Sequence, residues 1–181
     1  MPWSLFQRQR LARQRKELEA YFRDKVKWIN PADQHTTKVE VTVTLSNDKE
    51  YTLRVYIPSD FPNSCPSMIV SLPFYCLKKK NGSFLNVSSG EDHTLPSKEG
   101  CTQICHCRPD LWRNDYTLYQ VIIKGLSWLE AYEVHLETGD PLDWYLQADG
   151  SFLLDGVVKE LQQSYHRDKS CGLPRFIWAE Q

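Results

Sequence analysis

The pattern that most restricts the fold of this 181-residue chain is a pair of alternating segments separated by a turn. Apolar residues occupy every second position in residues 39–45 and again in residues 51–57. A period of two places one set of side chains on the buried face of a strand and the other set in solvent. Between the segments, residues 46–49, Ser-Asn-Asp-Lys, are typical of a turn. The two segments therefore predict an antiparallel β-hairpin.

The segments around this hairpin predict a third strand and several helices. Residues 67–72 form a short apolar run that Pro73 closes, which favours a third strand of the same antiparallel sheet. Residues 77–115 are expected to form one long irregular loop, and loops of this length in compact domains are commonly functional. Trp112 and Trp128 are expected to be packing residues. Helices with amphipathic spacing are expected at 5–27, 116–136 and 155–166, which makes the predicted fold α+β.

Composition restricts the class of protein. Hydrophobic residues make up 41% of the chain and charged residues 25%, as in average globular domains. No apolar stretch approaches the roughly 20 residues of a membrane-crossing helix, and the first residues do not read as a secretory signal. We therefore expect a cytoplasmic protein with no membrane partner. Residues 1–150 are expected to form one domain, and residues 151–181 a C-terminal helix and tail that pack on it or extend it.

Charge and cysteine content restrict the partners. The net charge of −1 argues against a nucleic-acid partner. Residues 1–30, however, contain eight Lys or Arg and only three Asp or Glu. This local excess of positive charge fits an acidic partner as well as it fits an ordinary solvated surface. The six cysteines are interpreted as free thiols, because nothing in the sequence signals the secretion that a disulfide framework requires.

Three motifs follow one another along the chain. They are YIPSDFPNSCPSMIV at 56–70, a run from His93 through Gly100 and Ile104-Cys105 to Trp112, and Asp140-Pro141-Leu142. In this order they resemble the motifs of the ubiquitin-conjugating enzymes, the UBC-like superfamily, over roughly residues 8–146. In that family the second motif contains the active-site cysteine and the third motif faces it.

The resemblance implies a UBC-like fold with an N-terminal helix, an antiparallel β-meander, an active-site loop and C-terminal helices. It implies a carrier that accepts a ubiquitin-like modifier from an activating enzyme as a thioester on Cys105 and transfers it to an amine of a protein substrate. No cofactor and no metal are expected, since the activating enzyme performs the ATP-dependent step. The segment WLEAYEVHLETG at 128–139 is similar to divergent bacterial members encoded in conjugation operons, which implies a role in antiphage defence.

The resemblance also implies the roles of individual residues. Cys105 is the nucleophile, because a thiolate is both strongly nucleophilic and a tolerable leaving group. Asp140 accepts the proton of the attacking amine or orients the amine. His93 is expected to hold the cysteine segment through a hydrogen bond to the backbone of the loop, with a general-base role as the alternative. Contacts with partner proteins are expected from the first helix and from the loop of the first motif, at Arg8, Arg13, Lys16, Phe61 and Pro62.

One departure from the family concerns the oxyanion that forms during acyl transfer. The family's His-Pro-Asn motif reads His93-Thr94-Leu95 here, so the asparagine that stabilises the oxyanion has no counterpart. A hydrogen-bond donor is still required at this point of the reaction. The backbone N–H groups of the loop and three side chains remain as candidates: Thr94, Asn86 and His106.

Other roles for the same cysteines compete with this interpretation. Cys105 can be a buried structural thiol, with Cys101 and Cys107 as the alternative nucleophiles. A zinc site built from these three cysteines and His106 is a further alternative, but it lacks the paired C-x-x-C spacing of zinc knuckles. The main alternative for the whole chain is a non-catalytic UBC variant or RWD-like domain that only binds proteins.

Overall fold

The computed structural model describes residues 1–147, so the predicted tail 151–181 with its helix at 155–166 lies outside the described residues. The described part is an α+β protein with an N-terminal helix, a six-stranded antiparallel sheet and helices after the sheet. The elements in chain order are α1 (Leu5–Phe22), the 3-10 helix η1 (Arg23–Lys25), β1 (Val26–Ile29), β2 (Lys38–Thr44), β3 (Glu50–Tyr56), β4 (Ser67–Leu72), β5 (Thr94–Lys98), β6 (Cys101–Ile104), the 3-10 helix η2 (Pro109–Leu111), α2 (Leu118–Thr138) and α3 (Leu142–Gln147).

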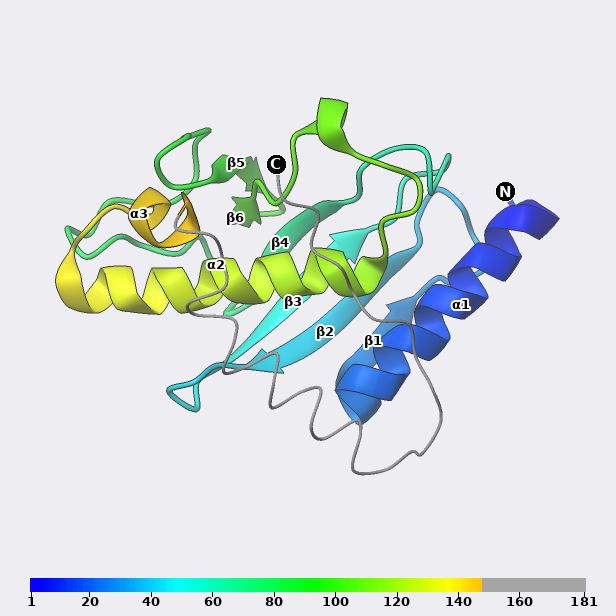
Figure 1. The fold of residues 1–181 in the computed structure, drawn as a ribbon, viewed down its shortest axis with the longest axis horizontal. Coiled ribbons are helices and arrows are strands. Elements are labelled where there is room, and N and C mark those ends of the chain that lie inside the picture. Colours follow the sequence, from blue (N-terminus) through cyan, green and yellow to red (C-terminus); the bar gives the residue numbers. More distant parts are fainter. Residues whose placement is uncertain (148–181) are drawn as a thin grey trace.

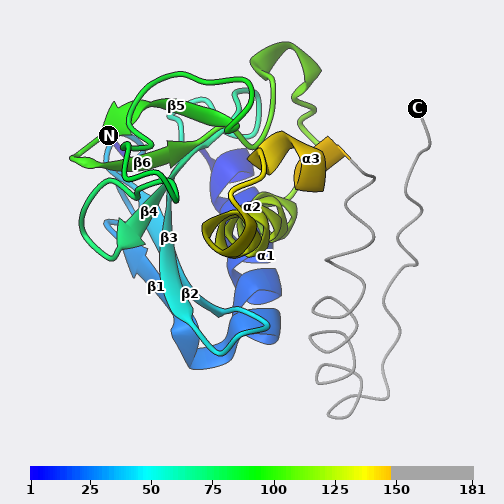
Figure 2. The same ribbon diagram turned by 90° about the vertical axis from the view of Figure 1, so that its left-hand side faces the viewer.

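The two long helices cover one face of the sheet. Figures 1 and 2 show α1 and α2 on the same side of the strands, with α1 beside β1 and β2 and α2 across the middle of the sheet. The strand order is β1-β2-β3-β4-β6-β5, and every neighbouring pair is antiparallel. Trp128 of α2 is buried, which confirms that it is a packing residue. Other fully buried residues of the core are Leu53, Met68, Ile122, Leu126 and Leu129.

The backbone of α2 lies close to the sheet at Gly125. A Cβ atom at this position would lie 2.7 Å from Cδ1 of Leu53 and 2.7 Å from Sδ of Met68, well inside van der Waals contact. The absence of a side chain therefore lets the helix pack directly on β3 and β4. The helix ends at Gly139, whose φ of +86° is typical of a helix C-cap. The helix predicted at 116–136 is confirmed, with both ends displaced by two residues.

The first helix is shorter than the sequence predicts. The prediction of a helix over 5–27 is wrong beyond Phe22, because Arg23 adopts a positive φ of 54° that ends α1. Arg23–Lys25 form the short 3-10 helix η1, and Val26–Ile29 then form β1, which pairs with β2. Its valine, tryptophan and isoleucine favour strands, so propensity and pairing agree here. The predicted apolar face of α1 is buried at Leu11, Leu18 and Phe22.

The sheet contains the predicted meander and a second hairpin that was not predicted. The strands expected from the alternating pattern and from residues 67–72 are present as β2, β3 and β4. Residues 77–115, however, contain the hairpin β5–β6, whose turn at Glu99 and Gly100 has two positive φ angles, 53° and 75°. The strand β6 pairs with β4, with Ile104 opposite Met68. This pairing brings the residues that follow Ile104 to one end of the sheet.

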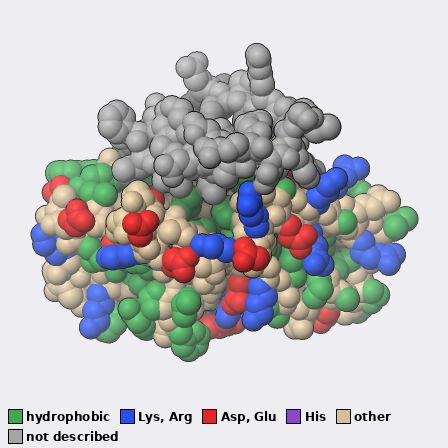
Figure 3. Space-filling view, turned by 90° about the horizontal axis from the view of Figure 1, so that it is seen from below, with side chains coloured by type: hydrophobic (Ala, Val, Ile, Leu, Met, Phe, Trp, Pro, Cys, Tyr) green, Lys and Arg blue, Asp and Glu red, His purple; other side chains and the backbone are tan. Residues whose placement is uncertain are grey.

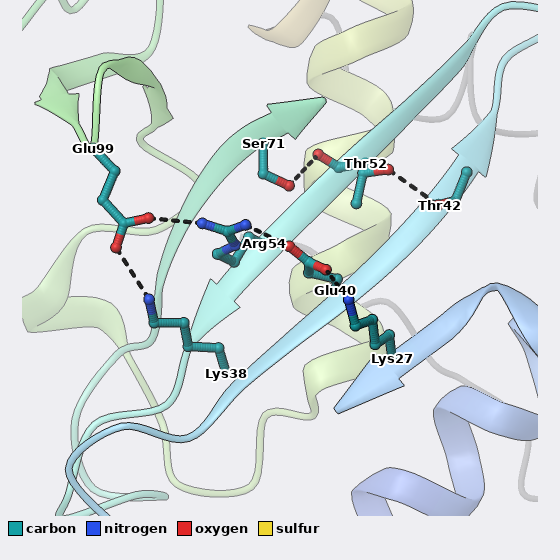
Figure 4. A network of polar contacts seen from close by, with 8 residues as sticks. All are labelled: Lys27, Lys38, Glu40, Thr42, Thr52, Arg54, Ser71 and Glu99. Carbon is teal, nitrogen blue, oxygen red and sulfur yellow. Dashed lines mark hydrogen bonds and ion pairs between the residues drawn. The ribbon is translucent and has the colours of Figure 1, made fainter. Parts of the chain in front are cut away.

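The face of the sheet away from the helices is polar. Figure 4 shows a network there that joins β1, β2, β3 and the β5–β6 turn. Arg54 lies 2.6 Å from Oε1 of Glu40 through Nη2 and 2.7 Å from Oε2 of Glu99 through Nη1. Lys38 and Lys27 add ion pairs to Glu99 and Glu40, respectively. The sheet therefore has one face on the core and one face of paired charges in solvent, as antiparallel sheets commonly do.

Candidate active site

Cys105 lies directly after β6, where the chain leaves the sheet. Its backbone N–H donates a hydrogen bond to the carbonyl oxygen of His93 at 2.8 Å. His93 directly precedes β5 and has a positive φ of 49°, so the two residues flank the open end of the β5–β6 hairpin. The Cys105 residue is neither fully buried nor fully exposed. The nucleophile predicted from the sequence is therefore partly accessible and is held in place through its backbone.

The ring of His93 connects this cysteine segment to α3. Its Nε2 lies 2.7 Å from Oδ1 of Asp143, and the backbone N–H of Asp143 donates to the carbonyl oxygen of Glu91 at 3.0 Å. Two contacts therefore dock the start of α3 on the segment before β5, so the ring of His93 contacts α3 while its backbone carbonyl contacts the cysteine segment. Asp143 was not predicted. Its only signal in the sequence is its position three residues after Asp140, in Asp-Pro-Leu-Asp.

Asp140 lies in the short connection between α2 and α3. Its Oδ2 accepts a hydrogen bond from the hydroxyl of Tyr145 at 2.9 Å, and its carbonyl oxygen accepts one from Nδ1 of His135 at 2.6 Å. These contacts orient both the carboxylate and the backbone of Asp140. Within residues 1–147 no hydrogen bond joins Asp140 to Cys105 or His93. Its role toward an incoming amine stays a prediction.

Two of the three side chains predicted to stabilise the oxyanion already donate hydrogen bonds to backbone carbonyl oxygens. Thr94 is buried, and its hydroxyl donates to the carbonyl oxygen of Val87 at 2.8 Å. Nε2 of His106 lies 2.7 Å from the carbonyl oxygen of Pro66, and burial lowers the pKa of His106, so the neutral ring donates its one proton there. The prediction that Thr94 or His106 donates to an oxyanion is therefore wrong for this arrangement. The exposed Asn86 and backbone N–H groups remain.

The electrostatic environment of Cys105 favours the thiol over the thiolate. Burial raises the pKa of Cys105, and the neighbouring Cys107 raises it further. Burial and Cys107 likewise raise the pKa of Cys65, in the loop before β4, to about 12. Because the thiolate is the nucleophile, Cys105 must lose its proton as it attacks. Because these shifts arise in part from one another's charges, Cys65, Cys105 and Cys107 are three neighbouring thiols of one site.

The zinc alternative has no support in the part of the chain that the structure describes. No group of three or more His, Cys, Asp or Glu side chains in residues 1–147 is arranged to hold a metal ion. Cys101 stands at the start of β6 and Cys105 follows its end, so about 13 Å of extended chain separates the two residues. The sulfur of Cys76 donates to the carbonyl oxygen of Gly100 and lies near Cys101 instead.

Phe61 and Pro62 belong to the interior rather than to a partner surface. Phe61 has no exposed area, and Pro62 is buried as well. The carbonyl oxygen of Phe61 accepts a hydrogen bond from Gln7 of α1 at 3.1 Å, and that of Pro62 accepts one from Nε1 of Trp112 at 2.8 Å. The prediction that Phe61 and Pro62 contact a partner is therefore wrong. Trp112 packs against the core, as predicted, and ties the chain after Cys105 to this loop.

α1 presents part of its basic surface to solvent. Arg8, Arg13 and Lys16 are exposed, and none of them forms an ion pair with another described residue. Arg10 differs, because its Nη2 lies inward and donates to the carbonyl oxygen of Tyr116 at 2.9 Å. On the face of the molecule seen in Figure 3, basic and acidic side chains are interspersed. Arg8, Arg13 and Lys16 therefore contribute positive charge on α1 that no described acidic side chain pairs with.

Comparisons with known proteins assign no family to this chain. No family model matches the sequence, and no curated protein gives a significant match. Among residues 1–147, no helix has both the length and the apolar character needed to span a bilayer. Any assignment of function therefore rests on the sequence motifs and on the geometry around Cys105.

Proposed function

We propose that this protein is a ubiquitin-conjugating-type carrier with a UBC-like fold, which holds a ubiquitin-like modifier as a thioester on Cys105. An activating enzyme supplies the modifier, and an amine of a protein substrate receives it. The order of elements supports this proposal, since a helix, an antiparallel meander, a cysteine segment and further helices follow one another as in the family that the motifs resemble. The observation that carries it is the partly accessible Cys105, held by its backbone to His93.

The surface near Cys105 favours a protein ligand. Three apolar side chains are largely exposed on segments that adjoin the cysteine: Val87 (61%), Leu111 (58%) and Trp144 (65%). Val87 is hydrogen-bonded to Thr94 of β5, Leu111 belongs to η2, and Trp144 follows Asp143 in α3. Apolar side chains of this kind supply the hydrophobic area that protein interfaces bury. They are the expected contacts of the modifier.

Both steps of the proposed reaction use the same sulfur. In charging, the Cys105 thiolate attacks the carbonyl carbon of the activating enzyme's thioester, the old C–S bond breaks, and the thiolate of the activating enzyme leaves. In discharge, a neutral amine attacks the new thioester, an amide forms, and the Cys105 sulfur leaves and is reprotonated. Asp140 is the acceptor that we assign to the proton of the amine. The raised pKa of Cys105 keeps the sulfur protonated between turnovers.

The test is a charging reaction with the cognate activating enzyme, the modifier and ATP, separated on a gel with and without reductant. An adduct that reductant removes, and that is lost in Cys105→Ser, supports the carrier function. The activating enzyme's own thioester is the internal control, because it shows that modifier and ATP are competent. If the activating enzyme is charged and the wild-type protein forms no adduct, the carrier function is contradicted.

A non-catalytic UBC variant or RWD-like binding module is the second candidate. The observation that favours it is the engagement of Thr94 and His106, which leaves the oxyanion without these donors. A module of this kind binds the modifier equally well as Cys105→Ser and forms no thiol-sensitive adduct. Calorimetric titration of both variants with the modifier, beside the charging gel, separates the two functions.

A further inference from the structure

Three cysteines meet where the pairing of β4 with β6 ends. In this pairing Met68 lies opposite Ile104 and Ile69 opposite Gln103. When the same antiparallel register is continued outward, Pro66 falls opposite His106 and Cys65 opposite Cys107. The hydrogen bond between Nε2 of His106 and the carbonyl oxygen of Pro66, 2.7 Å long, shows that the two segments stay together beyond the last paired residues.

The thiols of Cys65 and Cys107 are neighbours that donate to different backbone carbonyl oxygens, Cys65 to that of Pro66 at 3.5 Å and Cys107 to that of Arg108 at 3.2 Å. The sulfur of Cys65 also lies 3.9 Å from Nε2 of His106, the residue before Cys107, and Cys107 is close enough to raise the pKa of Cys65. Cys105 is close enough to Cys65 and Cys107 to influence both electrostatically. All three residues are free thiols and are partly accessible. By contrast, Cys101 is buried and stands apart from this group.

We propose that Cys65 and Cys107 are a redox modification site, which hydrogen peroxide or a related peroxide converts to a reversible disulfide beside Cys105. Cys65 and Cys107 lie just beyond the ends of β4 and β6, and the continued register places them opposite each other. Directly opposed residues of antiparallel strands have Cα atoms about 4.5 to 5.5 Å apart, which lies within the range that a disulfide spans. Cys105 precedes Cys107 by two residues and is not directly opposite Cys65 in this register. We therefore expect Cys105 to stay a free thiol when the other two are oxidised.

The oxidation proceeds in two balanced steps. The sulfur of Cys107, as thiolate, attacks one oxygen of the peroxide, the O–O bond breaks, and the products are a sulfenic acid and hydroxide, which takes up the thiol proton to form water. The sulfur of Cys65 then attacks the Cys107 sulfur, the S–S bond forms, the S–O bond breaks, and the departing hydroxide takes the Cys65 proton as a second water. The two thiols lose two electrons and the peroxide gains two.

The environments of the two thiols fit this order. The raised pKa of Cys65 disfavours its thiolate, so Cys65 suits the second step, in which the departing hydroxide accepts its proton. The disulfide joins the loop before β4 to the segment after β6 and encloses Cys105 within the closed part of the chain. It requires neither the activating enzyme nor the modifier, so its test stands apart from that of the carrier function.

The experiment treats the full, reduced chain with hydrogen peroxide at low molar excess, blocks remaining thiols with iodoacetamide and maps the peptides without reductant. We expect an intact mass lower by two hydrogens, a cross-link between the Cys65 and Cys107 peptides, and alkylated Cys105. Dithiothreitol should restore the original mass.

Single serine variants identify the pair. Cys65→Ser and Cys107→Ser should each abolish the loss of two hydrogens, and Cys76→Ser, the matched control, should leave it unchanged. Far-UV circular dichroism checks that each variant is folded, and a direct cross-link map of the wild-type chain keeps the test valid if a serine variant is not. A cross-link that involves Cys105, Cys101 or Cys171, or no cross-link at all, overturns the proposal.

Discussion

The backbone N–H of Cys105 donates a hydrogen bond to the carbonyl oxygen of His93 at 2.8 Å. The ring of the same histidine is paired with Asp143, 2.7 Å away. A chain of two contacts thus connects the start of α3 with the backbone of Cys105. Because α3 follows Asp140 after one residue, the same contacts also set the position of that carboxylate relative to the cysteine segment.

Asp143 should therefore act as a positioning residue in acyl transfer. Asp143→Ala removes the partner of the His93 ring, and we expect discharge of the thioester to an amine to slow about tenfold, equivalent to about 1.4 kcal/mol. Asp143→Asn retains an acceptor oxygen and should retain most of the rate. The measurement is single-turnover discharge to free lysine. Asp24→Ala, which removes an exposed carboxylate in η1, is the matched control, and equal rates for Asp143→Ala and the control contradict the role.

The raised pKa of Cys105 predicts a characteristic pH dependence. A group whose pKa is raised stays protonated to higher pH, so the reactive thiolate of Cys105 is scarcer at neutral pH than that of an ordinary cysteine. Alkylation by iodoacetamide should be slower at neutral pH than for a model thiol and should still be rising above about pH 8.5, where a model thiol is half ionised.

Cys107→Ser tests the second cause of this shift. Removal of the neighbouring thiol should move the alkylation curve of Cys105 toward lower pH without bringing it to the position of a free cysteine, since burial is the larger cause. Peptide mapping by mass spectrometry reports the extent of alkylation at Cys105 alone. A midpoint at or below that of a model thiol in the wild-type chain contradicts the prediction.

Gly125 predicts an unusual response to a helix-stabilising substitution. Alanine is favoured over glycine in a helix by about 1 kcal/mol, but the new Cβ meets the buried side chains of Leu53 and Met68 at 2.7 Å. Overpacking of a core costs about 1–3 kcal/mol, so we expect Gly125→Ala to lose about 1 kcal/mol in free energy of unfolding. Urea denaturation measures this loss. Lys124→Ala, on the exposed side of the same helix, should be close to neutral; a stabilised Gly125→Ala contradicts the close packing.

The basic face of α1 should speed the encounter with an acidic activating enzyme. The triple variant Arg8→Ala, Arg13→Ala, Lys16→Ala should lower the charging rate about 3- to 10-fold at low ionic strength, and the difference should shrink as salt screens the attraction. The double variant Lys25→Ala, Lys27→Ala removes positive charge elsewhere and serves as the control. Equal loss in both variants, or a loss that salt does not change, contradicts a docking role for α1.

Local patterns predicted the elements that alternate or repeat strongly. The β2–β3 hairpin follows from the strict period of two in 39–45 and 51–57, and α2 follows from its long amphipathic pattern. The hairpin β5–β6 does not follow from any local pattern. Its strand β5 contains Pro96, β6 has only four residues, and β6 pairs with a strand some thirty residues earlier. Short strands of this kind are stabilised by long-range pairing rather than by local propensity.

Of the candidate site, the sequence could predict only residues that belong to the three motifs. The motifs predicted that the His93 side chain holds the cysteine segment, whereas the hydrogen bond that joins His93 to Cys105 is between their backbones. The pairing of the His93 ring with Asp143 spans 50 positions, so no local pattern could indicate it. Phe61 was expected at a partner surface but is buried, because the loop that contains it folds back under α1 and is held by Gln7.

The most direct test of the central claim is a charging reaction that compares wild-type protein with Cys105→Ser and Cys107→Ser, followed by intact-mass analysis before and after reductant. The wild-type protein and Cys107→Ser should gain one modifier that reductant releases. Cys105→Ser should gain none, or only an ester that reductant does not cleave. A thiol-sensitive adduct that persists in Cys105→Ser contradicts the assignment of this cysteine as the carrier of the acyl group.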